Sequence, residues 1–166
     1  MNNPEKPYTN PGQTTTGFFQ IFESARIFDF FQLLIGANRS RKQLIEKFVR
    51  PKKDALILDI GCGTGAILDF LPKEVNYVGI DVSEQYIKEA ERRYCDRRAR
   101  FTSIRVGEIN LDKDAGKFDV VMANGVLHHL DNQEAEKLLF LAHEHLRIGG
   151  VFVSLDPVYV PDQSRL

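Results

Sequence analysis

Cysteine is scarce in this 166-residue chain, and neither sign of charge dominates it. The two cysteines, Cys62 and Cys95, stand in unrelated contexts, so we expect no disulfide framework and predict a reducing, cytoplasmic setting. A formal net charge of −1 excludes the strong electrostatic footprint of a nucleic-acid or acidic-membrane binder. The polar N-terminus lacks the basic and apolar runs of a signal peptide.

Other common chemistries are also missing. His143 and His145 are two residues apart on an expected helix and point to different faces, so we predict no metal site. No nucleophile elbow supports a serine hydrolase. The basic runs 39–42 and 92–100 are interpreted as solvated helix faces. Cys62 is interpreted as a small spacer in a glycine-rich turn, not as a reactive thiol.

The chain divides into three segments by composition. Residues 1–16, rich in proline, asparagine and threonine, are expected to be flexible. Residues 17–50 are expected to form two helices that cover the core or the site, the first over 18–35 and strongly aromatic. Charges at Glu23, Arg26 and Asp29 argue against a membrane span there. Residues 51–166 are expected to form one domain.

Strands and helices alternate through that domain. Apolar runs predict strands over 55–60, 76–80, 101–106, 118–123 and 151–155. Helical patterns predict a short helix over 64–71, a helix capped by Ser83, and a third that Gly149-Gly150 ends. Strict alternation predicts the α/β class with a doubly wound, Rossmann-like parallel sheet.

The most informative segment is Ile57-Leu-Asp-Ile-Gly-Cys-Gly-Thr-Gly65. It predicts a strand that turns through glycines into a helix, where the backbone approaches a ligand closely and helix N–H groups favour a negative group. Asp81 ends the next strand, twenty residues after Gly61. A carboxylate there accepts hydrogen bonds from ribose hydroxyls, so the pattern predicts an adenosine-containing cofactor.

Spacing alone leaves two cofactors open. Gly61, Gly63 and Ala66 fit the dinucleotide fingerprint, with Asp81 at the expected distance. Asp59, however, would repel a nearby pyrophosphate, whereas a carboxylate suits a cofactor that carries an ammonium and a sulfonium. Asp59 therefore favours the second cofactor.

At this point the sequence resembles class I S-adenosylmethionine-dependent methyltransferases, whose first motif is Asp-x-Gly-x-Gly-x-Gly. Further motifs follow in the family's order over residues 54–157: Gly79-Ile-Asp-Val-Ser83, Phe101 to Ile109, Phe118 to Leu130, and Leu146 to Asp156. The resemblance is greatest to uncharacterised bacterial methyltransferases. It implies S-adenosylmethionine as cofactor, S-adenosylhomocysteine as product, and a set of cofactor-binding residues: Asp59, Gly61, Cys62, Gly63, Gly65, Asp81, Val82, Glu108, Ile109, Asn124 and Gly125.

His128 and His129 are the candidates for a general base, which the reaction needs only if the acceptor carries a proton. The resemblance favours a small-molecule acceptor, with no nucleic acid and no membrane span. The stretch 156–159 and the aromatic helix are weak candidates for lining its pocket. Two other interpretations remain: an NAD(P)-dependent oxidoreductase, and a non-catalytic cofactor-binding domain.

The family's sheet normally continues with two more strands, which this chain is expected to lack. The fifth strand would then be a sheet edge. We expect residues 151–160 to pair with a second copy, to be covered by the N-terminal segment, or to promote aggregation.

Overall fold

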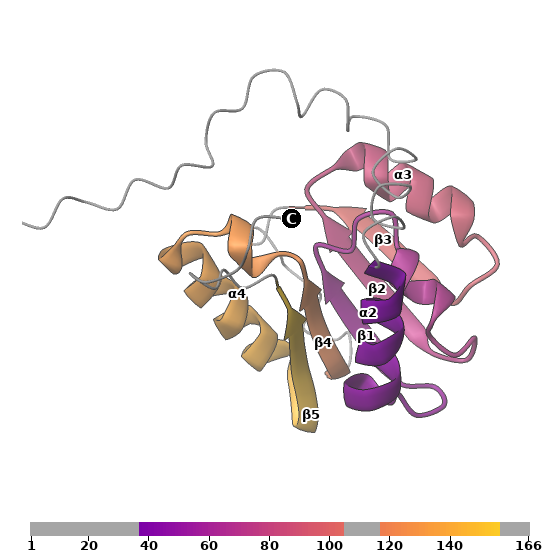
Figure 1. Ribbon diagram of the computed structural model, residues 1–166, viewed down its shortest axis with the longest axis horizontal. Coiled ribbons are helices and arrows are strands. Elements are labelled where there is room, and N and C mark those ends of the chain that lie inside the picture. The colour runs from indigo at the N-terminus through magenta and orange to yellow at the C-terminus, as the bar shows by residue number, and fades with distance from the viewer. Residues whose placement is uncertain (1–36, 105–116, 157–166) are drawn as a thin grey trace, which may run out of the picture.

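Five parallel strands with helices on both faces form the part of the chain that the structure, a computed structural model, describes: residues 37–104 and 117–156 (Figure 1). The predicted α/β, Rossmann-like parallel sheet is confirmed. The strands are β1 (Leu56–Ile60), β2 (Asn76–Asp81), β3 (Ala99–Ser103), β4 (Phe118–Asn124) and β5 (Leu146–Leu155). The helices are α2 (Ala37–Leu44), which continues as a π-helical turn over Ile45–Val49, α3 (Glu84–Arg93) and α4 (Asn132–His145).

The strand order is β3-β2-β1-β4-β5. The chain adds strands on one side of β1 and then crosses to the other side at β4, so the order reverses between β1 and β4. Ligands of doubly wound sheets bind beside the carboxyl ends of the strands at such a point. Asp59 and Asn124 lie there, near the ends of β1 and β4.

Alternate side chains of the central strands supply two separate cores. On one face, Ile57, Tyr77 and Met122 pack with Leu44, Ile45 and Val49 from α2 and its π-helical turn. On the other face, Leu58, Ile80 and Val121 pack with Leu138 and Ala142 of α4. Burial on both faces explains the nearly unbroken apolar runs of β1 and β4.

The segment after the glycine turn differs from the expected helix over 64–71, because only a 3-10 turn forms, over Ala66–Asp69. The segment is short, and Pro72 disfavours helical backbone at Leu71. Arg97 donates instead to the carbonyl oxygens of Leu68, Leu71 and Pro72. A four-residue turn has little dipole, so the predicted attraction of an anion to a helix N-terminus does not apply here.

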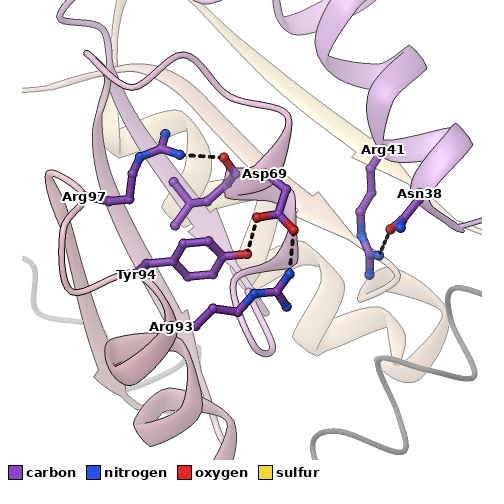
Figure 2. A network of polar contacts seen from close by, with 7 residues as sticks. Asn38, Arg41, Asp69, Arg93, Tyr94 and Arg97 are labelled. Carbon is purple, nitrogen blue, oxygen red and sulfur yellow. Dashed lines mark hydrogen bonds and ion pairs between the residues drawn. The ribbon is translucent and has the colours of Figure 1, made fainter.

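Polar contacts attach this 3-10 turn to the end of α3 (Figure 2). The Asp69 carboxylate accepts a hydrogen bond from the Tyr94 hydroxyl at 3.0 Å and pairs with the Arg93 guanidinium at 2.5 Å. Arg93 and Arg97 were expected on a solvated helix face. They instead connect the segment that follows the glycine turn to the helix that follows Asp81.

Two boundaries also differ from the sequence prediction. β3 begins at Ala99 and ends at Ser103, whereas 101–106 was expected. α4 passes into β5 without a loop, so Gly149-Gly150 lies inside the strand, where the pairing with β4 shifts register between Phe118 and Val120. Gly149 adopts a φ of 78°, as a bulge residue often does. The glycines thus permit a bulge and do not end the helix.

Within the described residues, β5 pairs with β4 alone and forms one edge of the sheet (Figure 1). Val151 and Leu155 of β5 are exposed. Pairing of this edge with a second copy stays a prediction. No helix in the described part of the chain is long and apolar enough to span a membrane.

Several predictions lie outside the described residues. These are the flexible segment 1–16, the aromatic helix over 18–35, the adenine contacts of Glu108 and Ile109, and the stretch 157–159.

Candidate functional site

A cavity of about 770 Å³ opens at the carboxyl ends of β1, β2, β4 and β5. Its volume lies in the range of small-molecule and cofactor sites. Ten residues predicted for the site line this one cavity: Asp59, Gly61, Cys62, Gly63, Asp81, Val82, Asn124, Gly125, His128 and His129. Gly65 does not line it. Gly65 has a φ of 72° and lies against Tyr94 and Phe101, so its role is to turn the chain.

Asp59 is held by an aromatic residue of the neighbouring strand. The Tyr77 hydroxyl donates to Oδ2 of Asp59 at 2.6 Å, and both residues are buried. In the pairing of β1 with β2, Asp59 lies opposite Gly79, and Tyr77 is two residues away. A Cβ at Gly79 would lie 2.9 Å from the Tyr77 ring, so the missing side chain gives that ring room to reach Asp59.

Burial changes the charge of Asp59. Loss of hydration raises the pKa of this carboxyl from 3.8 to about 7, the Tyr77 hydrogen bond lowers the pKa in part, and nearby Asp81 raises it. The other carboxylate oxygen, Oδ1, is buried and has no hydrogen-bond partner within the described residues. An unpaired buried acceptor is costly. A cationic donor in the cavity would remove that cost.

Asp81 organises the glycine turn. Its Oδ2 accepts the Gly63 N–H at 2.8 Å, and its Oδ1 accepts the Ser83 N–H at 2.9 Å. Each carboxylate oxygen keeps a further accepting position. Gly61 and Gly63 adopt positive φ angles of 73° and 55°. A Cβ on Gly61 would meet Val126 at 2.4 Å, whereas one on Gly63 would meet no atom within 4 Å. The backbone at Gly63 is therefore open to a ligand.

Cys62 lies between these glycines. Burial, with Asp59 and Asp81 nearby, raises the pKa of its thiol, and so the thiol is held in the protonated, unreactive form. This agrees with its interpretation as a spacer. Both cysteines are free.

The far side of the cavity is formed where β4 and β5 end. Oδ1 of Asn124 is buried and has no hydrogen-bond partner within the described residues. The Gly125 N–H donates to the Leu155 carbonyl at 2.8 Å. The 3-10 turn Leu127–His129 follows, and the two histidine rings lie 3.8 Å apart between centroids. Burial and the neighbouring His128 lower the pKa of His129.

Sequence reasoning missed the contributions of three residues, Arg41, Tyr77 and Tyr86, and one contact, between Asp156 and His128. Asp156, in the stretch 156–159 that was a candidate for the pocket, does line the cavity. Arg41, expected on a solvated face, lines the cavity from α2, and its guanidinium donates to Asn38 at 3.1 Å (Figure 2). The only signal available for Arg41 was its basic cluster. Among the residues described here, no group of three or more histidine, cysteine, aspartate or glutamate side chains could hold a metal ion.

We predict that Gly79→Ala destabilises the protein by about 1–3 kcal/mol, the usual cost of overpacking a core. The new methyl group would lie 2.9 Å from side-chain atoms of Tyr77, Cys62 and Phe101. Urea unfolding followed by circular dichroism measures the loss. Cys62→Ala in the same chain should recover part of it, because one of the three close contacts disappears. An unchanged midpoint for Gly79→Ala would contradict this account of the packing beside Asp59.

Known proteins that resemble this chain are methyltransferases. A family model described as a methyltransferase domain matches residues 58–152. The mRNA cap guanine-N(7) methyltransferase of Schizosaccharomyces pombe is 30% identical over 135 residues, which are 72% of this chain and 37% of that protein. This chain thus spans little more than a third of that relative's length.

Two solved structures share the fold. An S-adenosylmethionine-dependent methyltransferase from Clostridium acetobutylicum superposes with a TM-score of 0.65 and 24% identity, covering 78% of this chain and 55% of the other. The N-methyltransferase NodS from Bradyrhizobium japonicum, in complex with S-adenosylhomocysteine, superposes with a TM-score of 0.63 and 22% identity, covering 70% and 60%.

Proposed function

Because this chain belongs to the methyltransferase-domain family of class I S-adenosylmethionine-dependent enzymes, we propose that it transfers a methyl group from S-adenosylmethionine to a small-molecule acceptor. One observation carries the proposal. A single cavity is lined by Asp81, which accepts a hydrogen bond from the glycine turn, by Asp59, which has an unpaired carboxylate oxygen, and by two histidines.

The residues present fit the cofactor. Asp81 would accept the two ribose hydroxyls through its free accepting positions while it continues to hold the Gly63 N–H. The open backbone at Gly61 and Gly63 would lie along the methionine part. The unpaired Oδ1 of Asp59 would face the ammonium group. Asn124 and Gly125 would lie near the methyl group, and Glu108 with Ile109 near the adenine, as the family resemblance implies.

The cofactor, when bound, supplies a methyl group that is already activated for in-line displacement. The protein has to hold the donor and the acceptor collinear and to exclude water, which can supply several kcal/mol of barrier reduction. The ends of β1 and β4, fixed in the sheet, form one wall of the cavity, and the turn Leu127–His129 forms another. The cavity can therefore orient two ligands on a rigid frame.

Asp59 is also the feature that speaks against the oxidoreductase alternative. A dinucleotide would bring two phosphates to the glycine turn, where Asp59 lies on the cavity wall. Like charges at close range are unfavourable. The ammonium group of the methionine part would instead be attracted to the Asp59 carboxylate.

The small-molecule acceptor is supported by the site and by the overall charge. The candidate bases His128 and His129 line the same cavity as the cofactor residues. The net charge of −1 offers no broad attraction for RNA. Relatives differ in this respect, since the Schizosaccharomyces pombe protein is named for the mRNA cap. A reducing, cytoplasmic setting, compatible with the two free thiols, is part of the proposal.

The proposal is tested with S-adenosylmethionine labelled in its methyl group. The protein is incubated with an extract separated into small-molecule, RNA and protein fractions, and the label in each is counted. We expect label in the small-molecule fraction only, with Asp81→Ala reducing it to the level without protein. Label confined to RNA or protein would contradict the proposed acceptor class, and a failure to bind S-adenosylhomocysteine would contradict the cofactor.

A further inference from the structure

We propose that Asp156 is a positioning residue that makes His128 the base for an acceptor whose reacting oxygen or nitrogen carries a proton. This inference rests on the proposed methyl transfer and specifies its acceptor. It starts from a contact between two segments that are 28 positions apart in sequence. Nδ1 of His128 lies 2.9 Å from Oδ1 of Asp156.

The strand register places the two residues together. Asn124 of β4 lies opposite Leu155 of β5, so the residues that follow each strand leave the sheet side by side. The Gly125 N–H donates to the Leu155 carbonyl, and the His128 backbone N–H donates to Asp156 Oδ1 at 3.2 Å. The turn that carries His128 is thus attached to the end of β5 at two points. The His128 ring is held relative to the sheet.

The carboxylate decides which ring nitrogen carries the proton. Asp156 Oδ1 can only accept, so the contact at 2.9 Å requires a proton on Nδ1 of a neutral His128 ring. Nε2 then holds the lone pair and can take a proton. Asp156 is partly buried, with 15% of its side chain exposed, and its Oδ2 has no partner in the described part of the chain. A carboxylate in that position also stabilises the ring once it becomes protonated.

His129 lacks this arrangement. Within the described residues, the His129 ring makes no hydrogen bond like that of His128 to Asp156. Its pKa is lowered by burial and by the adjacent His128 ring, which makes it a weaker base. His128 is faced by Asp156 and His129, and the other charged groups on the cavity wall are Asp59, Asp81 and Arg41. Of the two histidines, His128 is therefore the better general base, because its ring contacts a carboxylate.

The step balances with the methyl donor as the only co-reactant. The lone pair of the acceptor oxygen or nitrogen forms the bond to the methyl carbon. The electron pair of the carbon–sulfur bond goes to sulfur, and the acceptor's proton goes to Nε2 of His128. An acceptor that has already lost this proton would have no use for the base. The pair thus indicates a hydroxyl, whose proton leaves as its oxygen attacks, or a protonated amine, which gives its proton to Nε2 of His128 before its lone pair attacks.

Nitrogen NMR of the intact, cofactor-free protein with labelled histidine tests the geometry without any acceptor. At a pH where His128 is neutral, we expect its proton on Nδ1. In Asp156→Asn and in Asp156→Ala we expect the proton to move to Nε2, the nitrogen that a free imidazole prefers. The second variant keeps the test valid if the first misfolds. A His128 ring with the proton on Nε2 in the unmodified protein would overturn the proposal, as would an unchanged tautomer in both variants.

Transfer of labelled methyl to the small-molecule fraction tests the role. His128→Gln should lower the rate roughly 100- to 10,000-fold, the usual contribution of a general base, and Asp156→Asn should lower it at least tenfold. The exposed His143→Gln is the matched control and should transfer normally. Affinity for S-adenosylhomocysteine should stay within twofold in all three variants. An unaltered rate in His128→Gln would overturn this inference. Absence of cofactor binding in the unmodified protein would instead contradict the proposed function.

Discussion

Replacing Asp81 with alanine is expected to weaken S-adenosylhomocysteine binding by roughly 100-fold or more. Two hydrogen bonds from ribose hydroxyls to a carboxylate contribute about 1.5–3 kcal/mol each, and each 1.4 kcal/mol corresponds to about a tenfold change in affinity. Loss of the carboxylate also frees the Gly63 and Ser83 N–H groups, so the glycine turn becomes less ordered. Isothermal titration calorimetry measures the change in affinity.

Asp119→Ala is a close control for this experiment. Like Asp81, Asp119 accepts a backbone hydrogen bond, from the Leu56 N–H at 2.8 Å, and it also pairs with Arg147. It lies at the opposite end of the sheet, near the start of β4. Both variants should lose some stability and keep their circular dichroism, but only Asp81→Ala should lose the ligand. Equal affinities in the two variants would mean that the ribose lies elsewhere.

Asp59→Asn is expected to change stability and binding in opposite directions. Its native pKa of about 7 lies above the ordinary 3.8, so the folded state binds the proton more tightly than the unfolded state. The stability from neutral Asp59 is fully present below pH 3.8 and is lost as the pH rises through 7. At pH 8 the unmodified protein carries the whole penalty, on the order of a few kcal/mol. The asparagine variant should therefore be more stable at pH 8 and show little difference at pH 4.

Binding should show the reverse pattern. At pH 8 the ionised Asp59 attracts the ammonium group of S-adenosylhomocysteine, so Asp59→Asn should bind it roughly tenfold more weakly or worse, the loss of one charged hydrogen bond. Near pH 5.5 Asp59 is mostly protonated, and the two proteins should bind alike. Tyr77→Phe removes the hydrogen bond that lowers the pKa of Asp59, so Asp59 becomes protonated at a higher pH. As the pH is lowered from 8, the affinity of this variant should therefore begin to fall earlier than that of the unmodified protein. An affinity of the unmodified protein that is flat from pH 5.5 to 8 would contradict this role of Asp59.

The strands and the first motif could be predicted from sequence because local chemistry determines them. β1 and β4 are buried on both faces and so read as apolar runs, and the glycine turn needs positive φ angles at Gly61 and Gly63. The Ser83 cap was equally local, since its hydroxyl oxygen accepts the N–H of Tyr86, three residues further along the chain. The residues at the strand ends came together because parallel strands share one edge.

Other features depend on how distant strands align, which the linear pattern does not encode. The Tyr77–Asp59 contact requires Gly79 opposite Asp59, and the Asp156–His128 contact requires the register of β5 against β4. The expected helix over 64–71 does not form because the segment is short and Pro72 follows it, and the carbonyl groups of its end accept hydrogen bonds from Arg97, 25 or more positions away. The role expected of Gly149-Gly150 failed because the pair allows a bulge in β5, a feature of strand pairing.

Calorimetric titration of the intact chain, first with S-adenosylhomocysteine and then with NAD at pH 8, tests the central claim most directly. The account predicts saturable binding of one S-adenosylhomocysteine per chain and no heat of binding with NAD, because the Asp59 carboxylate suits an ammonium group and repels a pyrophosphate. Saturable binding of NAD together with no binding of S-adenosylhomocysteine would contradict it.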